Sequence, residues 1–359
     1  MNSFDNFSIL FVGDSLHIGN RIFPMGAMAT EILNWDRVPL RKLRTRAEEF
    51  DSAICAVLKS RDRELIPTAQ EKLNAVFDIA LTLPPFCYMQ IDVGLMRRCL
   101  IYAARDDEMW AEAMDGQTYG GEALRLLISK VHELPERLNI FREHVELMLA
   151  FYFDALTSRT ASEYGKAYGR YCADMIRGGA LFFPDLEFKQ SFPANVKFVP
   201  IRTQQGFAVA EETDFGELHA FLYTDFYRGM IHGHLPRRCQ NCGRYFLLTD
   251  GYDTRYCSNI APGETDRTCR KVGAHVKAQN SRDKAAETPE GKEYQTTYNR
   301  LKRRKYLGKI STDEWNTQVA EAVSIREKAS RGEISEQELK ELLASIGGGK
   351  RKWKKKSGG

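Results

Sequence analysis

Four cysteines in one short stretch of the chain have the spacing of a metal site. Cys239 and Cys242 form a Cys-x2-Cys pair, 14 residues separate Cys242 from Cys257, and 11 separate Cys257 from Cys269. Zn²⁺ prefers four tetrahedral ligands and binds thiolates well. The two-residue gap places both sulfur atoms of one turn on one metal. The spacing therefore predicts a zinc site, and a complete set of four protein ligands predicts a structural rather than a catalytic ion.

The sequence also allows a histidine as one of the four ligands, because His275, His232 and His234 lie close enough in the sequence to replace one cysteine. Clustering of thiols in a chain without a secretion signal favours a metal over disulfides. The remaining cysteines are scattered through apolar segments, and we expect them as buried small side chains: Cys55, Cys87, Cys99 and Cys172.

Basic residues surround the cysteines and recur towards the C-terminus. Residues 237–359 hold 27 Lys and Arg against 16 Asp and Glu, a net charge of +11, whereas the rest of the chain carries −7. Guanidinium groups match phosphate geometry, and aromatic side chains such as Tyr298, Tyr306 and Trp353 can stack on unpaired bases. The pattern predicts a nucleic-acid contact through these residues: Arg237, Arg238, Arg244, Arg255, Arg270, Lys271, Arg303 and Arg304. The alternative is that the arginines offset thiolate charge or pair with Asp250, Asp253 and Asp266.

The stretch Ile9–Gly19, ILFVGDSLHIG, resembles the first block of the GDSL (SGNH) hydrolases, in which the serine is the nucleophile. A serine nucleophile needs a base and a group that orients the base. The family supplies these through an Asp-x-x-His block and a Gly-x-Asn-Asp block, and the chain contains neither in a matching place. We therefore expect Ser15 to lie in a β-hairpin with a Gly-Asp turn, and we expect no enzyme activity.

The cysteine region resembles a zinc-ribbon-like domain of an uncharacterised bacterial family of the Firmicutes type. The segments that carry the resemblance are RRCQNCGRYF, RYCSN and RTCRKVGA. It is also distantly similar to the CGNR-type zinc fingers of bacterial stress regulators, although Cys269 is followed by Arg-Lys-Val-Gly and not by Gly-Asn-Arg. The resemblance covers about residues 214–280 and implies no established activity.

The elements that must hold these residues follow from apolar periodicity. Steps of three and four residues through Leu43 to Val57, and similar steps around 73–79, 124–131 and 141–156, predict helices. Ser162 is the expected cap of the next helix. Two strands are expected at 196–201 and 207–209, and a helix from Asp214 to about Met230 leads into the cysteines.

The C-terminal third contains two similar helix starts. Ser311 and Ser335 are each followed three residues later by Glu, which is the capping-box pattern. The two segments also match half of a calcium-binding loop, but basic and apolar residues occupy ligand positions, so we expect helices without calcium.

Together these features predict a predominantly helical α+β fold. The expected divisions are an N-terminal hairpin with a helical body (1–185), strands, a lead-in helix and a zinc-ribbon or treble-clef-like module (186–282), a basic helical tail (283–346) and a disordered Gly/Lys tail (347–359). No apolar run approaches the roughly 20 residues that cross a bilayer, so we expect a cytoplasmic protein without a membrane partner.

The functional hypothesis is a zinc-containing protein that binds DNA or RNA, as a transcriptional or stress regulator. The alternative is a module that binds a protein partner or senses a ligand, with zinc only stabilising the fold. A GDSL-type serine hydrolase is the remote alternative.

Overall fold

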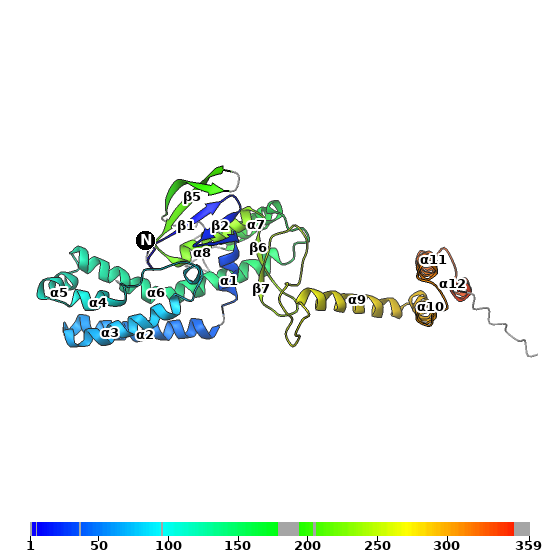
Figure 1. Ribbon diagram of the computed structural model, residues 1–359, viewed down its shortest axis with the longest axis horizontal. Helices are drawn as coiled ribbons and strands as arrows, with labels where there is room; N and C mark the ends of the chain where they lie inside the picture. The colour runs from blue at the N-terminus through cyan, green and yellow to red at the C-terminus, as the bar shows by residue number, and fades with distance from the viewer. Residues whose placement is uncertain are drawn as a thin grey trace, which may run out of the picture. The chain divides into compact units, whose positions relative to one another are not determined.

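The computed structural model describes residues 2–347 except Asp5, Asp36, Leu95, residues 179–193 and residues 204–205. The chain divides into two compact units, Met1–Ser258 and Asn259–Gly359 (Figure 1). The predicted α+β fold with predominant helix is confirmed. Most of the predicted Gly/Lys tail, residues 348–359, lies outside the described residues. The division into four parts stays a prediction.

A five-stranded antiparallel sheet joins two distant segments of the first unit in the order β3-β2-β1-β5-β4. The first three strands are consecutive at the N-terminus, and the other two come about 170 residues later. The strands are β1 (Phe7–Val12), β2 (Ser15–Ile18), β3 (Arg21–Pro24), β4 (Asn195–Thr203) and β5 (Gly206–Phe215). The predicted strands at 196–201 and 207–209 are therefore confirmed, within longer elements.

The Gly-Asp-Ser-Leu motif is the turn of the first hairpin, as predicted. Val12 pairs with Ser15 across the two-residue turn, and Gly13 has a φ of 58°, which tight two-residue turns require. The Ser15 hydroxyl donates to the neighbouring Asp14 carboxylate at 3.1 Å.

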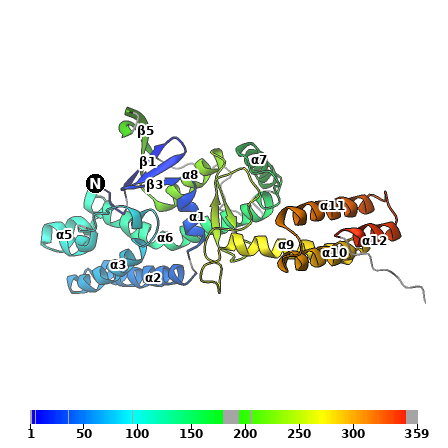
Figure 2. The same cartoon turned by 45° about the vertical axis from the view of Figure 1, so that its right-hand side comes forward.

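Helices make up most of the first unit (Figure 2). Leu43, Phe50, Ile54 and Val57 are each at most 1% exposed, so the predicted apolar stripe of this region is confirmed. The helices are α1 (Ala27–Leu33), α2 (Arg37–Ser60), α3 (Ile66–Ala80), α4 (Cys99–Ala103), α5 (Asp107–Met114), α6 (Tyr119–Met148), α7 (Ala161–Gly178) and α8 (Leu218–Ile231).

Three details of the prediction are wrong. Asp214 does not begin a helix: it lies in β5, where its carboxylate accepts hydrogen bonds from Ser8 and Lys197, and α8 begins at Leu218. Ser162 lies inside α7, and the Thr160 hydroxyl accepts from the Glu163 amide instead. The four scattered cysteines are not buried: Cys55 and Cys87 are exposed, and the other two are half-buried.

A buried aspartate on α8 holds the start of α1. Gly26 precedes α1 and has no side chain to cap it. The carboxylate of Asp225, which is fully buried, accepts hydrogen bonds from the Gly26 amide at 2.7 Å and the Ala29 amide at 2.9 Å. The cap of α1 therefore comes from a helix almost 200 residues later in the chain.

Replacing Asp225 by alanine should lower the free energy of unfolding by about 3 kcal/mol, because two buried amides would lose their acceptor. Urea denaturation at pH 7.5 measures the change. The matched control is Thr224→Ala on the same helix, where the hydroxyl donates to the Ala220 carbonyl of its own helix. Equal effects of the two substitutions would contradict the capping role.

The second unit contains α9 (Cys269–Glu287), α10 (Pro289–Tyr306), α11 (Thr312–Ser330) and α12 (Glu336–Ser345). Both predicted capping boxes, at Ser311 and Ser335, are confirmed. The last three helices bury a small core of their own around Leu301, Leu339 and Leu343. Among the described residues of the whole chain, no helix has the length and apolar character that a membrane span needs.

Candidate metal centre

A tight turn between two short strands presents the first two cysteines. β6 (Leu235–Arg238) and β7 (Tyr245–Leu248) are antiparallel. Inside the turn, the Cys239 amide donates to the Arg244 carbonyl at 2.8 Å, and the Gly243 amide donates to the Cys239 carbonyl at 2.9 Å. Gly243 has a φ of 74°, a conformation that glycine adopts without strain. The backbone of the turn therefore favours glycine at this position.

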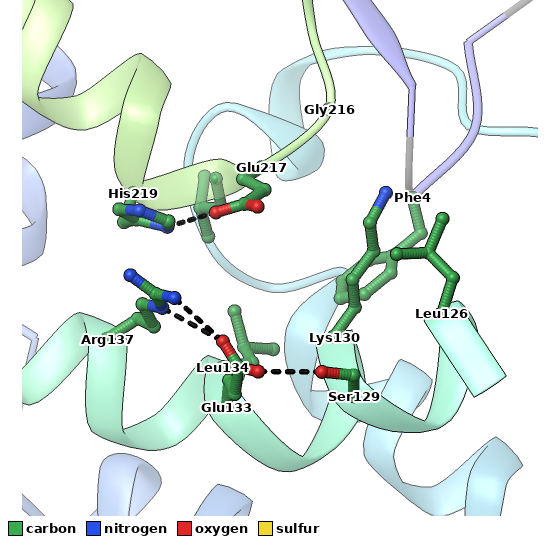
Figure 3. Close-up of a pocket in the computed structure, with 11 residues that line it drawn as sticks. Phe4, Leu126, Ser129, Lys130, Glu133, Leu134, Arg137, Gly216, Glu217 and His219 are labelled. Atoms are coloured by element: carbon green, nitrogen blue, oxygen red, sulfur yellow. Dashed lines mark hydrogen bonds and ion pairs between the residues drawn. The ribbon is translucent and has the colours of Figure 1, made fainter. Parts of the chain in front are cut away.

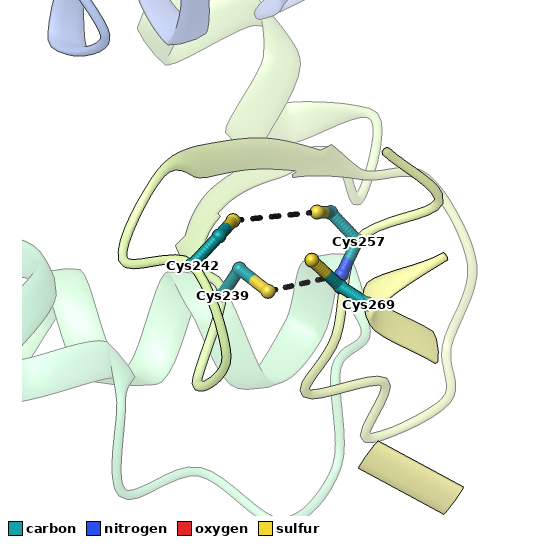
Figure 4. Close-up of side chains that lie close together, drawn as sticks. All are labelled: Cys239, Cys242, Cys257 and Cys269. Atoms are coloured by element: carbon teal, nitrogen blue, oxygen red, sulfur yellow. Dashed lines mark hydrogen bonds between the residues drawn. The ribbon is translucent and has the colours of Figure 1, made fainter. Parts of the chain in front are cut away.

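The loop after β7 brings the third cysteine to the turn. The Gln240 amide donates to the Arg255 carbonyl at 3.0 Å and fixes the loop. Cys257 then donates its amide to the Cys239 sulfur at 3.3 Å, and its own sulfur lies 3.7 Å from that of Cys242 (Figure 4). Amides directed at sulfur stabilise the thiolate form that binds metals.

Cys269 is the first residue of α9. Its amide donates to the Asn259 carbonyl at 2.8 Å, and Ile260 bridges to Thr268 just before the helix. Thr268 caps the helix by accepting from the Lys271 amide. These contacts fix Cys269 at the N-terminal end of α9.

The four sulfur atoms all lie within 4.8 Å of one another, and three of the four cysteines are buried. These four residues could hold a metal ion. Burial opposes ionisation of Cys239, but amide donors from Cys242, Cys257 and Asn241 outweigh it and lower the pKa of this thiol to about 7. The local backbone therefore favours the thiolate of Cys239 even though this side chain is buried.

The alternative histidine ligands lie outside this group of described residues. His275 and His232 are exposed. His234 is buried, and its Nδ1 lies 3.2 Å from the Met25 carbonyl oxygen. Their substitution for a cysteine has no support in the geometry.

Two of the predicted phosphate contacts are engaged in the fold. Arg237 is 6% exposed and donates to the Asp253 carboxylate at 2.6 Å and to the Thr254 carbonyl at 2.9 Å. Arg255 pairs with the other oxygen of Asp253 at 2.9 Å. The buried Arg159 lies 3.7 Å from the same carboxylate. Asp253 therefore binds two guanidinium groups directly and has a third nearby. For Arg237 and Arg255 the structure shows the alternative that the sequence raised, pairing with an acid.

The other predicted contacts are more accessible. Arg304 is half-buried, and the rest are exposed and make no ion pair with any described residue: Arg238, Arg244, Arg270, Lys271 and Arg303. Arg238 donates to the Gly243 carbonyl at 3.1 Å, which holds it at the turn. The first turn of α9 contains no acidic residue.

A pocket of about 220 Å³ lies in the first unit between α6 and the start of α8 (Figure 3). Its charged groups neutralise one another. Glu133 accepts from Ser129 at 2.6 Å and from Arg137 at 2.8 Å, and His219 lies 3.0 Å from Glu217. Burial lowers the pKa of His219 and outweighs the nearby Glu217 carboxylate, which raises it. No motif in the sequence marks this pocket.

Comparison with known families matches residues 189–346 to a family described as "Family of unknown function (DUF6076)". The match includes all four cysteines and the helices α10 to α12. It agrees with the expected similarity to an uncharacterised family. No curated protein matches the chain, and no solved structure matches it.

Proposed function

We propose that this protein is a nucleic-acid-binding protein with a structural zinc ion held by Cys239, Cys242, Cys257 and Cys269, and that it is not an enzyme. The observation that carries the proposal is the group of exposed cations, free of ion pairs with the described residues, that accompanies this closed set of four thiols. A regulator of transcription or of stress is the role that the proposal favours.

Zinc suits the donor set. A tetrahedral site with Zn–S distances of about 2.3 Å requires sulfur atoms about 3.8 Å apart, and the Cys242 and Cys257 sulfurs are 3.7 Å apart. Four thiolates also suit iron, so metal analysis of the purified protein separates the two. With all four positions taken by protein, zinc would fix the turn and the start of α9 and would leave no site for substrate.

The cations exceed what the metal centre needs. Zn²⁺ with four thiolates carries a net charge of −2. Four exposed cations lie next to a cysteine ligand in the sequence or two residues away from one: Arg238, Arg244, Arg270 and Lys271. Cations in the first turn of a helix are unfavourable unless an anion lies near. Phosphate groups of a nucleic acid would supply the additional anions.

The double substitution Arg238→Gln with Arg244→Gln should weaken binding to labelled duplex DNA or single-stranded RNA about tenfold at moderate salt. It should also reduce the slope of log affinity against log salt by about 2, since each phosphate contact contributes roughly one unit. Fluorescence anisotropy across a salt series measures both quantities.

The matched control is Lys42→Gln with Lys59→Gln, which removes the same charge from exposed positions on α2. It should leave affinity and slope close to those of the unmodified protein. Absence of binding to both DNA and RNA at low salt would end the proposal.

A second candidate, a protein-interaction module, has an observation in its favour. Phe198, Phe207 and Val209 on β4 and β5 are each more than 70% exposed, and large exposed apolar groups often mark interaction surfaces. Recovery of one stoichiometric partner protein that is insensitive to nuclease would favour this candidate.

A further inference from the structure

Three arginines converge on a hollow between two helices of the first unit. α2 and α6 lie side by side (Figures 1 and 2). Arg41 and Arg44 are three residues apart on α2, so they share one face, and Arg142 faces them from α6. The hollow measures about 370 Å³ and is called the α2–α6 groove. Its lining residues are Leu40, Arg41, Arg44, Asn139, Arg142, Glu143 and Glu146.

Arg142 is the incompletely bonded member of this set. Its side chain is only 13% exposed. Its Nε is buried and has no hydrogen-bond partner among the described residues. Its Nη2 lies 3.9 Å from a Glu146 carboxylate oxygen, which is longer than a hydrogen bond. Arg142 lines the groove, and its guanidinium has no close carboxylate acceptor among the described residues, so the groove favours an anion whose oxygen atoms reach this guanidinium.

The acidic residues of the groove do not fully neutralise the arginines. Glu143 accepts from the Asn139 amide at 2.9 Å. Among the described residues, Glu146 makes only the long contact to Arg142. Arg44 pairs with Glu136 at 2.8 Å, but both side chains are about half exposed, where an ion pair contributes little and is readily exchanged. Arg41 is exposed and makes no ion pair with a described residue.

The groove lies close to the cysteine turn within the same unit. The pKa of Tyr245, on β7, is raised to about 12, mainly by burial. Two carboxylates, Glu146 and Asp154, raise this pKa further, and two guanidinium groups, Arg238 and Arg142, lower it. Arg142 of the groove and Arg238 of the turn therefore both lie near this one phenol.

We propose that the α2–α6 groove binds a phosphate group, with Arg142, Arg41 and Arg44 as donors. Planar guanidinium groups match the oxygen geometry of phosphate and can bind it with paired hydrogen bonds. The phosphate could belong to a small phosphorylated molecule or to a nucleic-acid backbone. These two sources share the same chemistry and differ in what else the protein must contact.

Titration calorimetry of the full-length, zinc-loaded protein with inorganic pyrophosphate at low salt tests the groove. Arg41→Gln and Arg142→Gln should each weaken pyrophosphate binding by about tenfold or more, as expected for the loss of a charged hydrogen bond. Arg41 is exposed, so its substitution leaves the fold intact even if that of Arg142 does not. The control is Arg46→Gln on the same helix, whose partner is Glu49, and it should change the affinity by less than about twofold.

A parallel anisotropy titration with labelled DNA and RNA distinguishes the sources. If Arg41→Gln weakens both pyrophosphate and nucleic-acid binding, the groove contacts a nucleic-acid backbone. If it weakens only pyrophosphate binding, or if nucleic acids do not bind at all, the groove takes a small phosphorylated ligand, and the result stands whether or not the proposed function does. Absence of pyrophosphate binding to the unmodified protein, or an equal loss in Arg46→Gln, would overturn the inference.

Discussion

If the four cysteines hold the proposed zinc ion, replacing Cys257 by serine should abolish metal binding and lower the free energy of unfolding by more than about 4 kcal/mol. Cys257 is 2% exposed, its sulfur lies 3.7 Å from that of Cys242, and its amide donates to the Cys239 sulfur. Serine keeps the amide but is a poor ligand for zinc. The remaining thiolates would then repel one another without an ion between them, and the turn and loop would open.

Metal analysis by mass spectrometry and urea denaturation measure the two effects on the same samples. The control is Cys55→Ser, which changes an exposed thiol on α2 and should keep one metal ion per chain and the original stability. A chelator should reproduce the loss of stability in the unmodified protein and should have little effect on Cys257→Ser. Full stability of the metal-free protein would show that the four thiols do not stabilise the fold through a metal.

The features that the sequence predicts correctly are those fixed over a few residues. The Gly13–Asp14 turn and the capping boxes at Ser311 and Ser335 each depend on a local hydrogen-bond pattern, and the Cys-x2-Cys pair lies in one tight turn. A local pattern carries its own physical reason, because the same few residues supply both donor and acceptor. The helices around Leu43–Val57 follow for a similar reason, since apolar periodicity is the main signal of a buried helix face.

The wrong predictions come from reading a residue without its neighbours in space. Cys55 follows Ile54, which is buried, and one residue along a helix is about 100° around it, so the thiol turns away from the core. Asp214 has a good residue type for a helix start, but β5 pairs with β1 and extends through Phe215. Sheet pairing between segments so far apart leaves no local signal.

Long-range contacts also decide which basic residues are available. Arg237 and Arg238 are adjacent in sequence, yet the first is buried against Asp253 and the second is exposed beside the turn. The α2–α6 groove was missed for the same reason. The closely spaced Arg41 and Arg44 were a visible basic signal, but only the packing of α6 adds Arg142 to them.

A buried histidine should make stability depend on pH. His144 on α6 is 5% exposed. Its Nε2 lies 2.8 Å from the Tyr171 hydroxyl and its Nδ1 lies 3.0 Å from the Tyr223 hydroxyl. A neutral ring can donate to one tyrosine and accept from the other. Burial lowers the pKa of His144 from 6.5 to about 4, because the protonated ring would lose its hydration.

The sign of the effect follows from the two states. Between pH 6.5 and 4 the unfolded chain binds a proton at His144 and the folded chain does not, so the free energy of unfolding falls as the pH falls. The total loss over this window is about 3 kcal/mol, from a shift of about 2.5 units at 1.36 kcal/mol each. In His144→Gln this loss is absent, so the stability difference between the unmodified protein and the variant should shrink by about that amount from pH 7.5 to pH 4.

The comparison with a variant is essential, because Asp225 titrates in the opposite sense. Burial raises the pKa of Asp225 to about 7, although the backbone amides that it accepts from lower it. As the pH falls, the folded protein therefore takes up a proton near pH 7, whereas the unfolded chain takes it up only near pH 4. The contribution of this group to stability therefore rises as the pH falls. The two contributions partly cancel in the unmodified protein. Urea denaturation of His144→Gln at several pH values isolates the histidine, and Val145→Ala, a buried non-titrating neighbour on the same helix, should differ from the unmodified protein by a constant amount. A constant difference for His144→Gln as well would mean that His144 is not held neutral by its burial between the two tyrosines.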